Sequence, residues 1–107
     1  MLPWIYLSAA IVTEVVGTVF LRFTDGFTRP VPSVVVVITY VASIWLTALA
    51  LRELEISLVY AIWAGVGTAA VAIIGMTALG ETVNGLKLAS IALVIGGVVG
   101  LNLSGAN

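Results

Sequence analysis

The sequence predicts an all-α membrane protein with four transmembrane helices in each subunit. Of its 107 residues, 62% are hydrophobic and only 8% are charged. A soluble domain of this length cannot bury so much apolar surface, so the solvent around most of the chain must be lipid. The apolar residues also fall into four runs, each long enough for a helix that crosses about 30 Å of hydrocarbon. Helices are expected because backbone groups in lipid must form their hydrogen bonds within the segment.

The four expected spans are separated by short polar loops. They cover residues 3–21, 31–51, 57–79 and 86–103. The Asp25-Gly26 pair is a turn signal, and Pro30 prevents the second span from extending backwards. Because no loop is long enough for a soluble domain, we expect residues 1–107 to form a single transmembrane domain.

The charged residues of the loops predict an orientation. Arg22, Arg29 and Lys87 lie on the side of the first and third loops, whereas Arg52 lies on the side of both termini. Cytoplasmic loops carry an excess of Lys and Arg. We therefore expect the first and third loops in the cytoplasm, although a bias of two charges also allows both orientations.

Glu14 is the one ionisable side chain within the first span, and it lies close to the midpoint. Insertion of an acidic residue at that depth costs roughly 2.5–3.5 kcal/mol. Such a residue is expected to face a protein interior or a wet cavity, and it marks a pathway for ions or substrate. The alternative is a protonated Glu that only packs against a neighbouring helix, a role that Asn or Gln would fill without a titratable group.

Small and hydroxyl-bearing side chains are expected around this acid. Residues three or four positions from Glu14 share its helix face, and they include Ala10, Gly17 and Thr18. Ala10 and Gly17 leave room beside the carboxylate, although plain helix packing is the favoured role for these two residues taken alone. In the second span, Tyr40 and Ser43 lie one turn apart and would add hydroxyl groups to the same cavity.

The third span contributes aromatic side chains. Tyr60, Trp63 and Gly67 fall on one helical stripe, and an aromatic ring near a carboxylate binds cations through its quadrupole. Tyr60 alone fits equally well in the aromatic belt at the membrane surface. Gly65 and Gly67 weaken the helix locally and predict a bend.

The fourth span carries a ridge of small residues at four-residue spacing, Ala92, Gly96, Gly100 and Ser104. Close backbone approach through small residues holds helices together in lipid. The ridge predicts that this span pairs with a second subunit, and an intramolecular contact is the alternative.

Several classes of function are excluded. The net charge is −1 and no basic patch exists, so nucleic-acid binding is not expected. The chain has no Cys and no His, and no metal-ligand cluster, nucleophile with a base or phosphate-binding loop is present. We therefore expect no enzyme activity, no metal and no cofactor, and any proton chemistry must come from a carboxylate.

Several segments resemble the small multidrug resistance family over the whole chain. They are Ile5-Tyr6-Leu7, Glu14-Val-Val-Gly17-Thr18, Gly26-Phe27-Thr28-Arg29-x-x-Pro32-Ser33, Tyr60-Ala-Ile-Trp63-x-Gly65-Val-Gly67 and Gly97-Val98. The resemblance implies an antiparallel dimer in the bacterial plasma (inner) membrane that exchanges protons for lipophilic or quaternary ammonium cations. It also implies that the position matching Glu14 binds both protons and drug. Tyr40, Tyr60 and Trp63 match positions that line the site, Thr18 matches one that borders it, and we add Gly97 to the pairing face.

The sequence is compatible with two branches of this family and with two kinds of dimer. A sister branch exports guanidinium ions and typically has a Trp shortly after the acid, where this chain has Val16-Gly17-Thr18. That difference favours lipophilic cationic drugs as cargo, with guanidinium export as the alternative. Residues 54–58 resemble members that act as paired subunits, so either a homodimer or a heterodimer with a paralogue is expected. A subunit that only assembles a partner, and a passive cation channel, are further alternatives.

Overall fold

The computed structural model describes residues 2–104, and its secondary structure is four α-helices. They are α1 (Leu2–Arg22), α2 (Pro30–Ala50), α3 (Ile56–Ala78) and α4 (Gly85–Leu103). Each helix is long and apolar enough to cross a membrane. The prediction of four membrane-spanning helices is confirmed, and the observed bounds differ from the expected ones by at most one residue.

Local chemistry explains where the helices begin. Pro30 stands at the start of α2, where its missing N–H group is not needed and its fixed φ angle suits a helix. At the start of α4, the side chain of Asn84 accepts a hydrogen bond of 2.8 Å from the backbone N–H of Lys87. That bond satisfies one of the donors that every helix leaves unpaired in its first turn.

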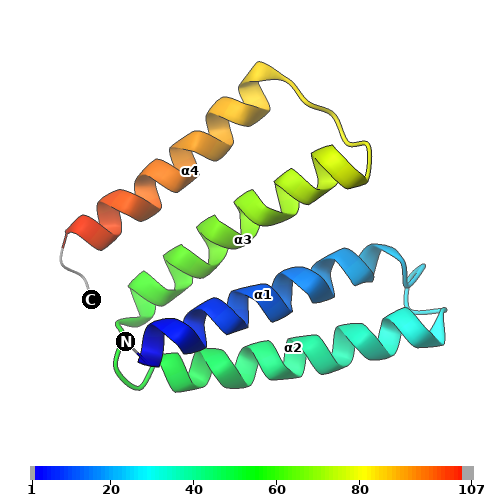
Figure 1. The fold of residues 1–107 in the computed structure, drawn as a ribbon, viewed down its shortest axis with the longest axis horizontal. Helices are drawn as coiled ribbons and strands as arrows, with labels where there is room; N and C mark the ends of the chain where they lie inside the picture. Colours follow the sequence, from blue (N-terminus) through cyan, green and yellow to red (C-terminus); the bar gives the residue numbers. More distant parts are fainter. Residues whose placement is uncertain (1, 105–107) are drawn as a thin grey trace. The chain divides into compact units, whose positions relative to one another are not determined.

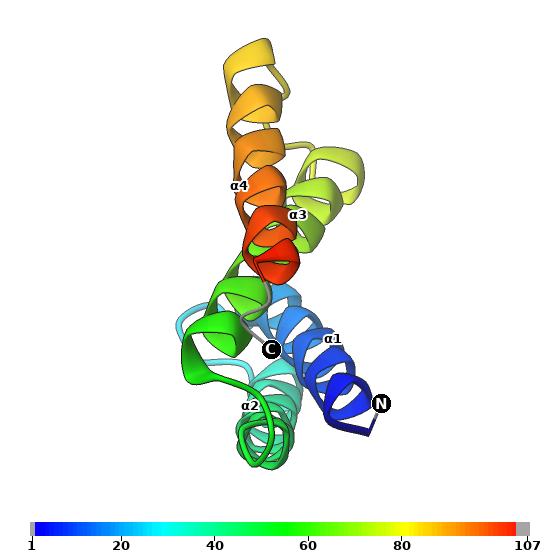
Figure 2. The same ribbon diagram turned by 90° about the vertical axis from the view of Figure 1, so that its left-hand side faces the viewer.

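The chain forms two compact units. In the first, Met1–Leu54, α1 and α2 pack side by side as an antiparallel hairpin (Figures 1 and 2). Its buried residues include Leu7, Ala10 and Val15 of α1 and Val36 and Ser43 of α2. This seam between α1 and α2 is the part of the fold that positions Glu14.

In the second unit, Glu55–Asn107, α3 and α4 form another antiparallel hairpin (Figure 1). Gly65 lies where the helices approach closely, because a Cβ atom built there would overlap the side chain of Val98. At the connection, the Glu81 carboxylate lies over Gly75 and is 3.9 Å from the ammonium of Lys87. No described residue of α4 is buried, so its apolar surface is open to lipid or to a partner.

Candidate functional site

Glu14 lies far from both ends of α1. It is the thirteenth of the 21 residues of α1, and Arg22, at the nearer end of the helix, lies eight positions further along the chain. At 1.5 Å per residue, the carboxylate is about 12 Å from that end. Its side chain is half-buried on the seam with α2 rather than fully exposed. A charge at this depth needs polar partners, and the seam supplies them.

The partners of Glu14 form a short chain of hydroxyl groups. The hydroxyl of Thr18 donates to Oε1 of Glu14 at 2.7 Å. The same hydroxyl is 2.7 Å from the hydroxyl of Tyr40 on α2. Thr18 differs in this respect from Thr13 and Thr39, whose hydroxyls donate to backbone carbonyls one turn earlier in their own helices. The Thr18 hydroxyl is therefore directed at the acid instead of at the helix backbone.

The protonation state of Glu14 affects which hydroxyl donates in each of these two hydrogen bonds. An ionised carboxylate only accepts hydrogen bonds, and a hydroxyl has one proton to donate. When Glu14 is ionised, Thr18 must donate to it, and Tyr40 must donate to Thr18. A proton on Oε1 would allow Glu14 to donate to Thr18 and Thr18 to donate to Tyr40, which reverses both bonds. Thr18 therefore links the Tyr40 hydroxyl to the Glu14 carboxylate by hydrogen bonds.

Gly17 makes the approach of Tyr40 possible. A Cβ atom at this position would lie 2.7 Å from Cδ1 and Cε1 of the Tyr40 ring and even closer to the hydroxyl oxygen of Thr39. Real Cβ atoms do not tolerate such distances, so any larger side chain would push α2 or its tyrosine away. The sequence predicts that Gly17 leaves room beside the acid. In the structure, the Tyr40 ring fills the space next to Gly17.

Ala10 and Ser43 meet one turn from Glu14 along α1. Ala10 is fully buried, and its carbonyl oxygen accepts a 2.7 Å hydrogen bond from the hydroxyl of Ser43. The Ser43 side chain is thus engaged with the α1 backbone in this conformation. Its expected contribution to a substrate cavity stays a prediction, whereas its role in joining the two helices is an interaction that sequence reasoning missed.

Tyr60 and Trp63 lie in the second unit. Their ring centroids are 5.7 Å apart with an interplanar angle of 67°, an edge-to-face arrangement. Tyr60 is 66% exposed, and the buried Nε1 of Trp63 has no hydrogen-bond partner among the described residues. A buried donor without a partner is unusual in a folded protein, because an unpaired N–H group loses its hydrogen bonds to water.

The other expected site residues are distributed along α3 and α4. Gly65 and Gly67 are buried within a continuous α3, and their expected role in bending stays a prediction. On α4, a Cβ atom at Gly96, Gly97 or Gly100 would meet nothing within 4 Å. Ala92 is exposed on the same helix. This face is open, and its pairing with a second subunit likewise stays a prediction.

Comparison with known proteins identifies the family. The family model described as "Small Multidrug Resistance protein" matches residues 2–94. The chain belongs to the small multidrug resistance family. It is therefore a multi-pass protein of the bacterial inner membrane and a member of a family of exporters, as its four apolar helices and its relatives agree.

Individual relatives of the family cover nearly the whole chain. The chain is 43% identical over 103 residues to the "Guanidinium exporter" of Escherichia coli strain K12, covering 96% of this chain and 98% of that protein. It is 45% identical over 101 residues to "Nicotine metabolites export pump subunit NepB" of Paenarthrobacter nicotinovorans, covering 94% and 61%. It is 38% identical over 100 residues to "Uncharacterized membrane protein YvaE" of Bacillus subtilis, covering 94% and 84%. These names favour the guanidinium alternative over the drug exporter that we expected first.

Proposed function

We propose that this chain forms a proton-coupled exporter in which Glu14 binds either protons or a small guanidinium-type cation. The observation that carries the proposal is the acid in the middle of α1, held by the Thr18 hydroxyl at 2.7 Å. An ionisable residue at such a depth is a functional site by default in a membrane protein. The relatives that are named guanidinium exporters supply the class of cargo.

The chemistry of the carboxylate fits a guanidinium ion. A guanidinium is a planar fork of N–H donors that matches the two oxygens of a carboxylate. A carboxylate has about four acceptor positions, and the Thr18 hydroxyl occupies one of them on Oε1 of Glu14. Oε2 and the remaining position on Oε1 are therefore left to receive a bidentate cation, while Thr18 fixes the orientation of the group.

Competition at one carboxylate produces the coupling. The proton and the cation both neutralise Glu14, so each lowers the affinity for the other by the same factor. The neutral forms of the site cross the low-dielectric barrier more readily than the ionised form, because an unpaired charge is poorly solvated there. A proton entering from one side is then exchanged for a cation leaving from the other.

We place two copies of the chain in the working transporter. The open small-residue face of α4 fits a second subunit, because small residues allow helices to approach closely in lipid. An antiparallel homodimer would bring two Glu14 carboxylates to one site. The relative that is named a pump subunit keeps a heterodimer with a paralogue as the alternative assembly.

Lipophilic quaternary ammonium cations are a second candidate cargo. They cannot donate hydrogen bonds and are recognised by aromatic faces beside a negative charge. The exposed ring of Tyr60, set edge-to-face with Trp63, favours this candidate. Val16-Gly17-Thr18 after the acid is the sequence feature that agrees with it.

Proton release by the purified protein tests both candidates. Guanidinium or tetraphenylphosphonium is added to detergent-solubilised protein in weak buffer, and released protons are measured. We expect guanidinium to release protons from the wild type and from Glu53→Gln, a matched change at an exposed acid outside the spans. We expect Glu14→Gln to release none and to lose proton-driven uptake into vesicles.

Each outcome of this experiment has a defined meaning. Proton release by tetraphenylphosphonium but not by guanidinium would show that lipophilic cations, and not guanidinium-type cations, are the cargo. Release that persists in Glu14→Gln would remove Glu14 from the mechanism. If neither cation releases protons from the chain alone, but both do after addition of a paralogue, the homodimer is refuted and the paired-subunit assembly replaces it.

A further inference from the structure

The loop between α1 and α2 is an unusual turn. Asp25, Gly26 and Phe27 have φ angles of 48°, 68° and 65°, so three consecutive residues are left-handed. Gly adopts this region freely and Asp tolerates it, but a bulky residue such as Phe seldom does. Strain of this kind persists only where surrounding interactions hold it in place.

Thr24 holds the turn. It is 1% exposed, and its hydroxyl donates to the carbonyl of Leu21 at 2.8 Å and accepts from the backbone N–H of Phe27 at 3.1 Å. Its carbonyl accepts from the N–H groups of Thr28 and Arg29 at 3.0 and 3.1 Å. One buried residue therefore fixes both sides of the strained segment.

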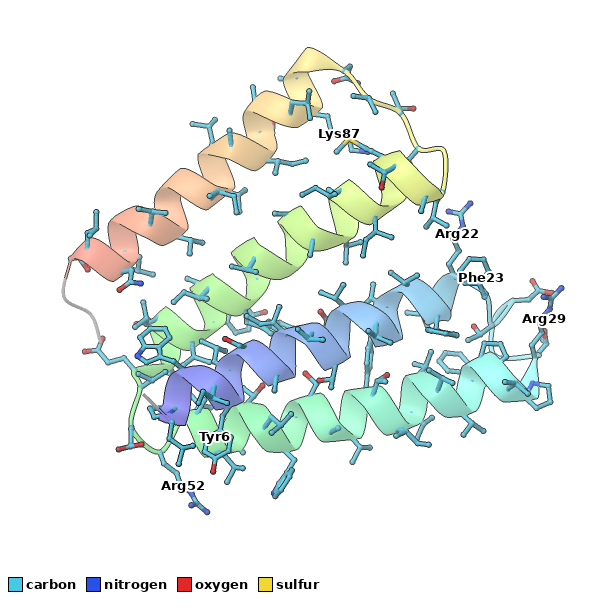
Figure 3. All side chains as sticks on the ribbon, viewed as in Figure 1. Tyr6, Arg22, Phe23, Arg29, Arg52 and Lys87 are labelled. Carbon is cyan, nitrogen blue, oxygen red and sulfur yellow. The ribbon has the colours of Figure 1, made fainter. Side chains whose placement is uncertain are left out.

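The strained turn brings no aromatic side chain into the core. Phe27 is 56% exposed and Phe23 is 46% exposed. Figure 3 shows Arg22, Phe23 and Arg29 at this end of the hairpin, whereas Tyr6 and Arg52 lie towards the opposite end. Two Phe rings exposed on one turn gain free energy if the medium that contacts them is apolar.

The membrane supplies such a medium at this position. The loop follows Arg22, the last residue of the membrane-spanning α1, and it therefore lies at the level of the lipid headgroups. Arg22 and Arg29 outnumber Asp25 in the segment, and Arg29 is exposed. Guanidinium groups bind phosphates, and basic residues near a membrane surface favour anionic lipids.

We propose that the left-handed turn at residues 25–27 is an anchor for anionic phospholipid. The Phe27 ring inserts at the boundary between headgroups and acyl chains, and Arg29 binds the phosphate of the same or an adjacent lipid. The backbone strain keeps the ring directed at the bilayer instead of at the protein. This site is separate from Glu14 and does not depend on the proposed cargo.

Brominated lipids test the anchor in the full-length protein. Phe27→Trp is reconstituted in vesicles of equal parts phosphatidylglycerol and phosphatidylcholine, with bromine on the acyl chains of only one lipid at a time. The wild-type signal from its own tryptophans is subtracted. We expect blue-shifted emission and stronger quenching by brominated phosphatidylglycerol, corresponding to a local enrichment of about fivefold for one arginine.

Charge variants supply the matched control. Adding Arg29→Gln should make the two brominated lipids quench equally, whereas Arg52→Gln, the same change at the other end of the hairpin, should leave the preference intact. Phe23→Trp supplies a second probe at the same end. Water-like emission without quenching at both positions would overturn the anchor, and equal quenching by both lipids before Arg29 is changed would overturn its preference for anionic lipid.

Discussion

Replacement of Gly17 by Ala tests the seam on which the site depends. The added methyl group would lie 2.7 Å from two carbons of the Tyr40 ring, against an ordinary contact of about 3.5–4.0 Å. It would also overlap the Thr39 hydroxyl. Because both neighbours belong to α2 and contact α1, the ring and the helix must move together to make room.

The expected magnitude follows from these contacts. An extra methyl group in a packed core costs about 1–3 kcal/mol, and loss of the bond between Tyr40 and Thr18 adds about 0.5–1.5 kcal/mol. The higher helix propensity of Ala offsets up to about 1 kcal/mol. We therefore expect Gly17→Ala to destabilise the protein by about 0.5–4.5 kcal/mol and to weaken cation binding as Tyr40 is displaced from Thr18.

Equilibrium unfolding in mixed micelles measures the loss of stability. Cation-induced proton release measures the weaker cation binding. Gly85→Ala is the matched control, because a Cβ atom there meets nothing within 4 Å. Its stability should stay within about 0.5 kcal/mol of the wild type. A Gly17→Ala variant as stable as this control, with unchanged cation affinity, would refute the close contact of α1 with Tyr40.

Three further perturbations address other parts of the molecule. Tyr40→Phe should reduce cation affinity by about two- to tenfold while leaving the fold intact, because only the hydroxyl that donates to Thr18 is lost. An unchanged binding isotherm would contradict the hydrogen-bonded link from Tyr40 through Thr18 to Glu14. Ser43→Ala should destabilise the protein by about 0.5–1.5 kcal/mol through the lost bond to the Ala10 carbonyl, as measured by unfolding. Cation affinity of the wild type should fall as pH is lowered, since protons occupy Glu14, and Glu14→Gln should abolish that dependence in a titration across pH values.

Part of the candidate site could be predicted from the sequence, because the position of a charged residue within an apolar span can be read along the chain. Glu14 could be assigned to the middle of an apolar run, and Thr18 to its face, from spacing alone. The link from Thr18 to Tyr40 could not be found in this way, since 22 positions separate them and their meeting depends on how α1 packs against α2. The bond between Ser43 and the Ala10 carbonyl was missed because every helical residue has a carbonyl group and spacing does not single one out.

The sequence by itself determined that this protein lies in a membrane, that it crosses the membrane with four helices, and that one acid lies near the middle of the first apolar span. These properties follow from local composition, because lipid imposes helix on every long apolar segment. Only the tertiary structure decided which hydroxyl groups reach that acid, why Gly17 must be small, and how Thr24 holds Phe27 outward. Those features depend on how side chains and backbone groups pack in three dimensions, and the order of residues along the chain does not specify those contacts.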